Sequence, residues 1–280
     1  MAVKTKDLKT NSALCTLWLA DTPQYESRKT ATIGNFQAEN KKAGTDIINQ
    51  ALQYLTDNGF EYAIGPMNGN TWHSYRFVTG GDNSPPFLME PKNPDFYPVI
   101  FQDTGFEPLG EYSSAKMNPI GAYEGIHPPE GIYIREFQKE HAKEELCKIW
   151  QLSLETFAHN FLYTPIDKKD FMALYTPILD KLLPEYVLMA ETANGTLKGF
   201  LFAIPDYTQG SSPDCLIVKT YASLQRGIGG ALLDMIHKRA EENGFQNLIH
   251  ALMYDGNISK KRTAKFSKPF RRYTLYGREL

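Results

Sequence analysis

The chain has 280 residues, of which 42% are hydrophobic and 22% are charged, so it is long and apolar enough for one large domain or two ordinary ones. This composition excludes global disorder. The 30 lysines and arginines are balanced by 32 aspartates and glutamates, and the net charge of -2 argues against a nucleic-acid coat along the whole chain.

No apolar run is long enough to cross a bilayer, and the first residues lack the long apolar region of a signal peptide. The three cysteines, Cys15, Cys147 and Cys215, are far apart and do not form the pattern of a disulfide framework or a zinc site. We therefore expect a cytoplasmic protein with no membrane partner and no bound metal.

Alternating apolar residues predict strands, and apolar residues at helical spacing predict helices. Before residue 118 the predicted elements are, in chain order, a strand at 14–19, a strand at 29–36, a helix at 44–58, a strand at 60–65, a short helix at 96–104 and a strand at 106–113.

Two segments are rich in turn-forming residues, 80–98 and 118–131. The second carries three prolines and no helical period, which is typical of a linker. We place a domain boundary there, with a partial domain at 1–120, a linker at 121–130 and a complete domain at 131–280.

The second part shows a regular alternation of strands and helices. The predicted elements are a strand at 131–138, a helix at 141–160, a helical stretch at 168–186 interrupted by Pro177, a hairpin of strands at 187–192 and 198–204, a strand at 214–222, a helix at 226–243, a strand at 245–254, a short polar helix at 257–266 and a strand at 270–280. Gly244 follows the long helix, as glycine often follows a helix C-terminus.

One segment of the first part overlays on the second without a gap. Residues 43–64 align with 228–249, and the identical pairs include Gly44/Gly229, Gly59/Gly244 and Phe60/Phe245. Any helix that ends in Asn-Gly-Phe before a strand would match in part, but the shared order of elements favours an internal duplication. The first half would then lack the opening strand and two helices of the second.

The segment Arg226-Gly227-Ile228-Gly229-Gly230-Ala231 directly follows a strand and opens a helix. Glycines let main-chain amides turn toward an anion, and the first helical turn has unpaired N–H groups with a partial positive charge. Arg226 can pair with phosphate in a forked geometry. A P-loop would need Gly-Lys-[Ser/Thr], and a dinucleotide fingerprint would need a third glycine where Leu232 stands. No companion motif of a protein kinase is present.

With its strand, glycine-rich loop, helix and following strand, the part of the chain from about 130 to 280 resembles the GNAT superfamily of acyl-CoA-dependent N-acyltransferases. The family's loop pattern is [Gln/Arg]-x-x-Gly-x-[Gly/Ala]; here Gly227 and Gly229 fit it, but Leu224 stands at the Gln/Arg position. This departure leaves the diphosphate contacts approximate. The resemblance implies an α/β fold (α+β) with a mixed, largely antiparallel sheet flanked by helices, here in two related halves.

The resemblance also implies acetyl-CoA, or another acyl-CoA, as co-substrate. Its pantetheine arm would lie along the strand that contains Val218, Lys219, Thr220 and Tyr221, with Asn257 contacting the arm. The first half has Lys42 where the second has Gly227, so we interpret it as a degenerate repeat that does not bind the cofactor. An unrelated N-terminal half joined to a single copy is the alternative.

Many members of the family use a tyrosine near the penultimate helix as the acid, and Phe266 stands at about that place. Tyr273 is our candidate acid, although a strand aromatic is more often a packing residue. His250 is our candidate base, directly or through water, and the alternative is a structural histidine. Glu191 and Asp206 are further base candidates.

The segment 65–75 brings polar and amphipathic side chains together on a loop, where binding residues often lie. Asn68, Asn70, Trp72, His73 and Tyr75 could line an acceptor site, although a purely structural loop fits equally well. The segment 259–280 carries eight lysines or arginines. A solvated basic face is the simplest interpretation, contacts with phosphates come next, and RNA binding is the least favoured because no motif accompanies the charge.

These features predict an N-acetyltransferase that moves an acetyl or acyl group from acetyl-CoA to a primary amine by direct attack in a ternary complex. The acceptor is a small-molecule or peptide amine, and the sequence leaves its identity, the acyl chain length and the oligomeric state open. The alternative is a non-catalytic acyl-CoA-binding sensor, suggested by Phe266 at the place of the usual acid.

Overall fold

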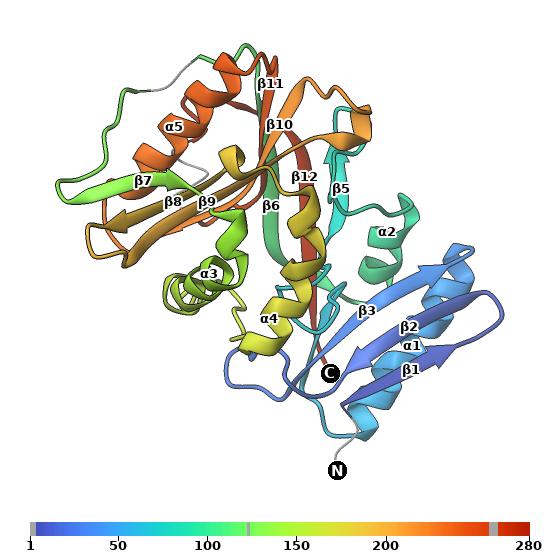
Figure 1. Cartoon of the computed structure of the whole chain (residues 1–280). Coiled ribbons are helices and arrows are strands. Elements are labelled where there is room, and N and C mark those ends of the chain that lie inside the picture. Colours follow the sequence, from blue (N-terminus) through green and yellow to red (C-terminus); the bar gives the residue numbers. More distant parts are fainter. Residues whose placement is uncertain (1–3, 122–123, 258–262) are drawn as a thin grey trace.

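The structure, a computed structural model, describes residues 4–121, 124–257 and 263–280. One continuous sheet runs through these residues, with helices on both of its faces (Figure 1). Among the described residues, only two pairs of neighbouring strands run parallel, and the others run antiparallel. The sheet is therefore largely antiparallel. The α/β fold with a mixed sheet that the sequence predicts is confirmed.

The first half contains each element predicted from the sequence and two more. Its elements are β1 (Thr5–Lys9), β2 (Ala13–Trp18), β3 (Thr30–Ala38), α1 (Lys41–Asp57), β4 (Tyr62–Gly65), β5 (Phe77–Gly81), α2 (Phe96–Asp103) and β6 (Glu107–Met117). The sequence analysis missed β1 and β5. The edge strand β1 is almost wholly exposed and polar, and β5 ends in two glycines, so neither shows apolar alternation.

The second half follows its predicted order closely. Its elements are β7 (Ile132–Glu136), α3 (Ala142–Thr156), α4 (Lys168–Tyr175), β8 (Val187–Thr192), β9 (Leu197–Pro205), β10 (Cys215–Ser223), α5 (Ile228–Glu242), β11 (Asn247–Tyr254) and β12 (Lys268–Glu279). The second helical stretch changes from α4 to a 3₁₀ turn at Thr176, directly before Pro177. Half of the short polar helix predicted at 257–266, residues 258–262, lies outside the described residues.

The two halves contain the same strand–helix–strand unit. In the first half α1 connects β3 to the parallel strand β4, and in the second α5 connects β10 to the parallel strand β11. Each helix ends before a glycine with positive φ, Gly59 at 68° and Gly244 at 81°. These units coincide with the segments 43–64 and 228–249 that overlay in the sequence.

The last strand of each half pairs with the other half. The sheet order is β1-β2-β3-β4-β12-β6-β11-β10-β9-β8-β7, with β5 also paired to β12. Thus β12 adds to β4 of the first half, and β6 adds to β11 of the second. Between them β6 and β12 form a long antiparallel ladder at the centre of the sheet, visible in Figure 1. The halves are therefore joined by main-chain hydrogen bonds as well as by side chains.

Neighbouring residues of β8 show how the second half is layered, because adjacent strand residues point to opposite faces. Leu188 packs with the apolar residues of α5, whereas Met189 packs with those of α3 and α4. The helices α5 and α3 thus cover opposite faces of the same strands. The cavity described below opens on the face that α3 and α4 cover.

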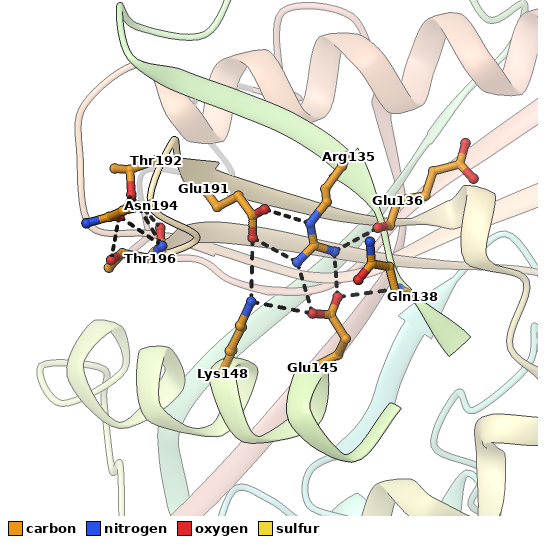
Figure 2. A network of polar contacts seen from close by, with 9 residues as sticks. All are labelled: Arg135, Glu136, Gln138, Glu145, Lys148, Glu191, Thr192, Asn194 and Thr196. Carbon is orange, nitrogen blue, oxygen red and sulfur yellow. Dashed lines mark hydrogen bonds and ion pairs between the residues drawn. The ribbon is translucent and has the colours of Figure 1, made fainter. Parts of the chain in front are cut away.

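A network of ion pairs attaches β7 and α3 to β8 (Figure 2). The Arg135 guanidinium donates to both carboxylate oxygens of Glu191 at 2.8 Å, and to those of Glu145 at 2.6 and 2.9 Å. Lys148 Nζ lies 3.7 Å from both carboxylates. The Glu145 side chain is only 2% exposed, so these partners are needed to stabilise its negative charge in the interior.

Replacing Arg135 by methionine should lower the free energy of unfolding by about 3 kcal/mol, because it leaves Glu145 buried with Lys148 at 3.7 Å as its remaining cationic partner among the described residues and a long hydrogen bond from the Gln138 amide at 3.4 Å. Urea titration of both proteins measures this difference. A matched control is Lys238→Met, which removes an exposed pair with Glu242 and should change stability by less than about 0.5 kcal/mol. Equal effects of the two substitutions would contradict a stabilising role of the network.

Candidate functional site

The strands β10 and β11 separate halfway along their length. They pair in parallel only from Cys215 to Val218 on β10, opposite Asn247 to His250 on β11. Beyond that point each strand shifts register against its outer neighbour: β10 against β9 at Lys219, and β11 against β6 between His250 and Met253. Such bulges bend strands and re-aim their side chains. Beyond Val218 and His250, the facing main-chain edges of β10 and β11 therefore do not hydrogen-bond to each other.

A cavity of about 1400 Å³ lies at this separation. Both halves of the chain build it. Its walls are residues 218–227 of β10 and the following loop, 250–254 of β11, the side chains of α3 and α4, and the segments 71–76 and 89–91 of the first half. A cleft with mixed apolar and polar walls at the junction of two units is a typical place for a ligand site.

The glycine-rich segment lies at one end of this cleft. Arg226, Gly227 and Gly229 line it, whereas Ile228, Gly230 and Ala231 are buried and pack beneath it. Gly227 is the N-cap of α5 with φ of 97°, and no side chain caps the helix there. The first-turn amides of α5 thus begin at the cleft wall, where they can bind an anion. A Cβ on Gly229 would lie 3.3 Å from Ser223 Oγ, so the glycine leaves room for a close approach.

The other predicted cofactor residues also line the cleft. Val218, Lys219, Thr220 and Tyr221 follow one another along β10, and Asn257 follows β11. A linear ligand that starts at the α5 terminus and runs along β10 would pass each of them. The structure thus brings together at one cleft most of the residues that the sequence pattern selected for the cofactor.

His250 lies on the cleft wall at the last position of β11 that pairs with β10, and it is 2% exposed. Its Nε2 lies 3.2 Å from Nε2 of His237 on α5, and the ring of Phe266 packs against both imidazoles. Burial lowers the pKa of His237 to about 4, although Asp234 opposes it. Burial and the neighbouring His237 lower the pKa of His250 well below 6.5. Both rings are therefore neutral at pH 7.

The histidine pair should make the protein less stable in mild acid. Since both pKa values are lower in the folded state, the unfolded chain takes up protons that the folded chain does not as the pH falls from about 6.5 to 4. The free energy of unfolding should then fall by up to about 1.4 kcal/mol per pH unit for each histidine. His250→Asn should flatten this slope, and the exposed His159→Asn should not. Parallel slopes in urea titrations of all three proteins would contradict the pair's role.

Tyr273 lies in the interior beside the cleft and is 1% exposed. Its hydroxyl donates to Glu90, and Ser114 Oγ lies 2.9 Å from it. Ser114 Oγ also accepts from the Leu252 amide at 2.9 Å, at the bulge of β11. Burial and the bond to Glu90 raise the pKa of Tyr273. Among the described residues that line the cleft, Tyr273 is absent, but its hydrogen-bond partner Glu90 is present. Its role as an acid stays a prediction.

The two further base candidates have structural partners. Glu191 belongs to the Arg135 network, where the hydrogen bond from Arg135 lowers its pKa. Asp206 is 4% exposed and accepts from the Leu88 amide at 2.9 Å and the Thr208 hydroxyl at 2.6 Å. Neither lines the cleft among the residues that the structure describes.

Sequence reasoning missed two charged residues of the cleft, Arg76 and Glu90. Glu90 lies in the segment 80–98 that was interpreted only as a turn-rich stretch; it is 7% exposed and pairs with Arg271 Nε at 3.1 Å. Burial raises its pKa. Arg76 stacks on Tyr75 and Tyr112 with its Cζ atom 4.0 and 4.3 Å from the ring centroids. A charged residue within a short apolar segment (YRFV for Arg76, FLME for Glu90) was the signal available.

The segment predicted to line the acceptor site divides into two parts. Trp72, His73 and Tyr75 line the cleft. Asn68 does not line it; its Oδ1 accepts from the amide of Asn35 on β3 at 2.8 Å. Asn70 accepts from the Trp72 amide at 3.0 Å and so shapes the turn.

The place in the first half that corresponds to the cleft is filled by the chain itself. The Met67 amide donates to Ile33 of β3 at 2.8 Å, and Met67 is fully buried. A Cβ on Gly34 would lie 2.5 Å from the Met67 carbonyl oxygen, so only glycine fits there. The N-terminus of α1 is also capped, because Asn40 accepts from the Ala43 amide at 2.9 Å. These contacts use groups that a cofactor would need in this half, and its inability to bind the cofactor stays a prediction.

The sequence matches no family model and no curated protein. Solved structures, however, share the fold. A GCN5-related N-acetyltransferase from Sphaerobacter thermophilus is 12% identical with a TM-score of 0.57, over 96% of this chain and 76% of that one. A tandem GNAT protein from the clavulanic acid biosynthesis pathway is 9% identical with a TM-score of 0.55, over 99% and 83%.

A third similar structure is the GCN5-related glucosamine N-acetyltransferase region of a fungal multi-domain β-N-acetylglucosaminidase, 12% identical with a TM-score of 0.56. It covers 95% of this chain, which spans 31% of the length of the fungal protein. The chain therefore has a GNAT-type fold, as the strand–loop–helix pattern predicted.

Two further observations concern only the described residues, 4–121, 124–257 and 263–280. No helix there is both long and apolar enough to span a bilayer. No group of three or more His, Cys, Asp or Glu side chains in those ranges is arranged to hold a metal ion.

Proposed function

We propose that the protein is an acyl-CoA-dependent N-acyltransferase, with acetyl-CoA as the simplest donor and a primary amine as acceptor. One observation supports this most: the cleft between β10 and β11 runs from the uncapped N-terminus of α5 to the point where the two strands separate. Amides at a helix start suit a diphosphate, and an open strand edge suits the amide groups of a pantetheine arm.

The proposed reaction is direct transfer in a ternary complex. The neutral amine attacks the thioester carbonyl carbon, a C–N bond forms, the C–S bond breaks, and the sulfur leaves as thiolate and takes up a proton. A main-chain N–H at the Lys219 bulge of β10 would donate to the carbonyl oxygen as charge develops on it. His250, neutral on the cleft wall, would accept the amine proton directly or through water. Holding both reactants in one cleft supplies much of the rate.

Two measurements test this proposal. Calorimetry with acetyl-CoA tests binding, and release of free CoA thiol in the presence of an amine panel tests transfer. Binding together with thiol release supports an acyltransferase. Absence of acetyl-CoA binding would overturn the proposal, and binding without thiol release from any acceptor would favour a non-catalytic acyl-CoA-binding protein.

A further inference from the structure

Two cations, Arg76 and Lys219, lie in the wall of the cleft on the side of α3 and α4, and neither forms an ion pair with a carboxylate among the described residues. Arg76 is 9% exposed. Its Nη1 donates to the Leu252 carbonyl at 3.2 Å, and its Nε has no partner among the described residues. Lys219 Nζ lies 3.4 Å from the Met89 carbonyl and 5.8 Å from the Phe87 ring centroid. No described aspartate or glutamate makes an ion pair within 4.0 Å of either side chain.

The two cations act on each other. Burial, followed by the charge of Arg76, lowers the pKa of Lys219 to about 8, and Glu90 acts in the opposite direction. Glu90 cannot neutralise both, because it already pairs with Arg271 at 3.1 Å and accepts from Tyr273 and from the Phe87 amide. Arg76 is buried and Lys219 is half-buried, and charges with so little water around them are normally paired. An anion of a bound ligand would therefore be stabilised in this part of the cleft.

The phosphates of coenzyme A are not that anion. They are expected at the N-terminus of α5, beyond the end of β10 at Ser223. Lys219 precedes that end by four residues, about 13 Å along an extended strand. An anion that binds Arg76 and Lys219 would thus lie near the thioester, where the acceptor must also be.

The wall around the cations is strongly aromatic. It includes Trp72, Phe157, Phe161, Phe171, Tyr175 and Tyr254. Phe161 and Tyr254 stack in parallel, 5.2 Å apart at 5°. This surface suits an apolar or aromatic side chain, and it lines the same cleft as the two cations.

We infer that the acceptor is an amine that also carries a carboxylate and an apolar body, such as an aromatic amino acid, and that Arg76 and Lys219 bind its carboxylate. This inference rests on the proposed acyltransferase function, since it identifies the acceptor of that reaction. The Arg76 guanidinium is well suited to a carboxylate because its planar donors match the two oxygens. The same carboxylate could instead belong to the acyl group, as in succinyl-CoA, and the experiment must separate these two sources.

The first experiment measures binding alone. Calorimetry compares 3-phenylpropionate, which has the carboxylate and ring but no amine, with 2-phenylethylamine, which lacks the carboxylate. The acid should bind at least tenfold more tightly, and Arg76→Gln and Lys219→Gln should each weaken its binding at least tenfold. Arg272→Gln, an exposed arginine on β12, is the matched control and should bind as the wild type does. Equal affinities for acid and amine, no binding of the acid, or unchanged binding in both variants would overturn the inference.

The second experiment tests whether the carboxylate that Arg76 and Lys219 bind belongs to the acceptor amine or to the acyl group of the donor. With acetyl-CoA as donor, thiol release should be at least tenfold greater in kcat/KM for L-phenylalanine than for 2-phenylethylamine. If instead succinyl-CoA binds more tightly than acetyl-CoA, and this advantage is lost in Arg76→Gln, the carboxylate belongs to the acyl group and the inference about the acceptor is wrong. Acetyl-CoA affinity is measured in parallel. Its absence defeats the proposed function, whereas intact acetyl-CoA binding without carboxylate selectivity defeats only this inference.

Discussion

Replacing Gly229 by aspartate is expected to weaken acetyl-CoA binding at least 100-fold. Gly229 lies in the first turn of α5 and lines the cleft, and Gly227 before it provides no side-chain cap. An aspartate there would place a negative charge where the diphosphate must bind, and would itself take the first-turn amides. The helix should still form, because an acidic residue in the first turn stabilises it. Calorimetry with acetyl-CoA, with thermal unfolding as the measure of folding, tests this.

Gly229→Ala is the matched control for this substitution. Its Cβ would lie 3.3 Å from Ser223 Oγ and 3.5 Å from the Tyr221 ring, a tight contact that adds no charge. We expect it to weaken binding by less than about tenfold, within the 1.4 kcal/mol that such a factor represents. If the aspartate variant bound acetyl-CoA as well as the alanine variant, the amides of this turn would not be the diphosphate site.

The residues at the α5 end of the cleft, where we propose that the cofactor binds, could be selected from the sequence because their signal is local. Gly227 and Gly229 stand between a strand and a helix, and the strand residues Val218 to Tyr221 precede them directly. On the opposite side, Trp72, His73 and Tyr75 line the cleft as the loop composition suggested, but Arg76 and Glu90 were missed because they reach the cleft only through the tertiary fold. Nothing within a few residues of Glu90 indicates that Tyr273 and Arg271, more than 180 residues away, are its partners.

The same distinction holds for the fold. The repeated helix, glycine and strand unit is visible in the sequence because its residues are contiguous. The alternation in β12 shows that a strand exists there, but not that β4 and β6 are its neighbours. Strand partners depend on pairing over long separations, and no local pattern encodes them. The pairing of β6 with β11 and of β12 with β4, each between the two halves, could therefore not be predicted from the sequence.

This pairing predicts that residues 131–280 cannot fold alone, although they contain each element expected of a complete domain. Without the first half, β11 loses its neighbour β6, and β12 loses β4, β5 and β6. The fragment would expose the main-chain edges of these strands together with buried residues such as Tyr273 and Leu275. It should be aggregated or unfolded, without a cooperative thermal transition in circular dichroism.

Adding residues 1–121 in trans provides the control, because it restores every missing strand. If this pairing holds the halves together, the two fragments should form a 1:1 complex whose thermal transition approaches that of the whole chain. Acetyl-CoA binding should then return with the complex, since residues 71–76 and 89–91 complete the cleft. A fragment 131–280 that melts cooperatively on its own would show that the second half is an independent domain and that pairing with β6 is dispensable.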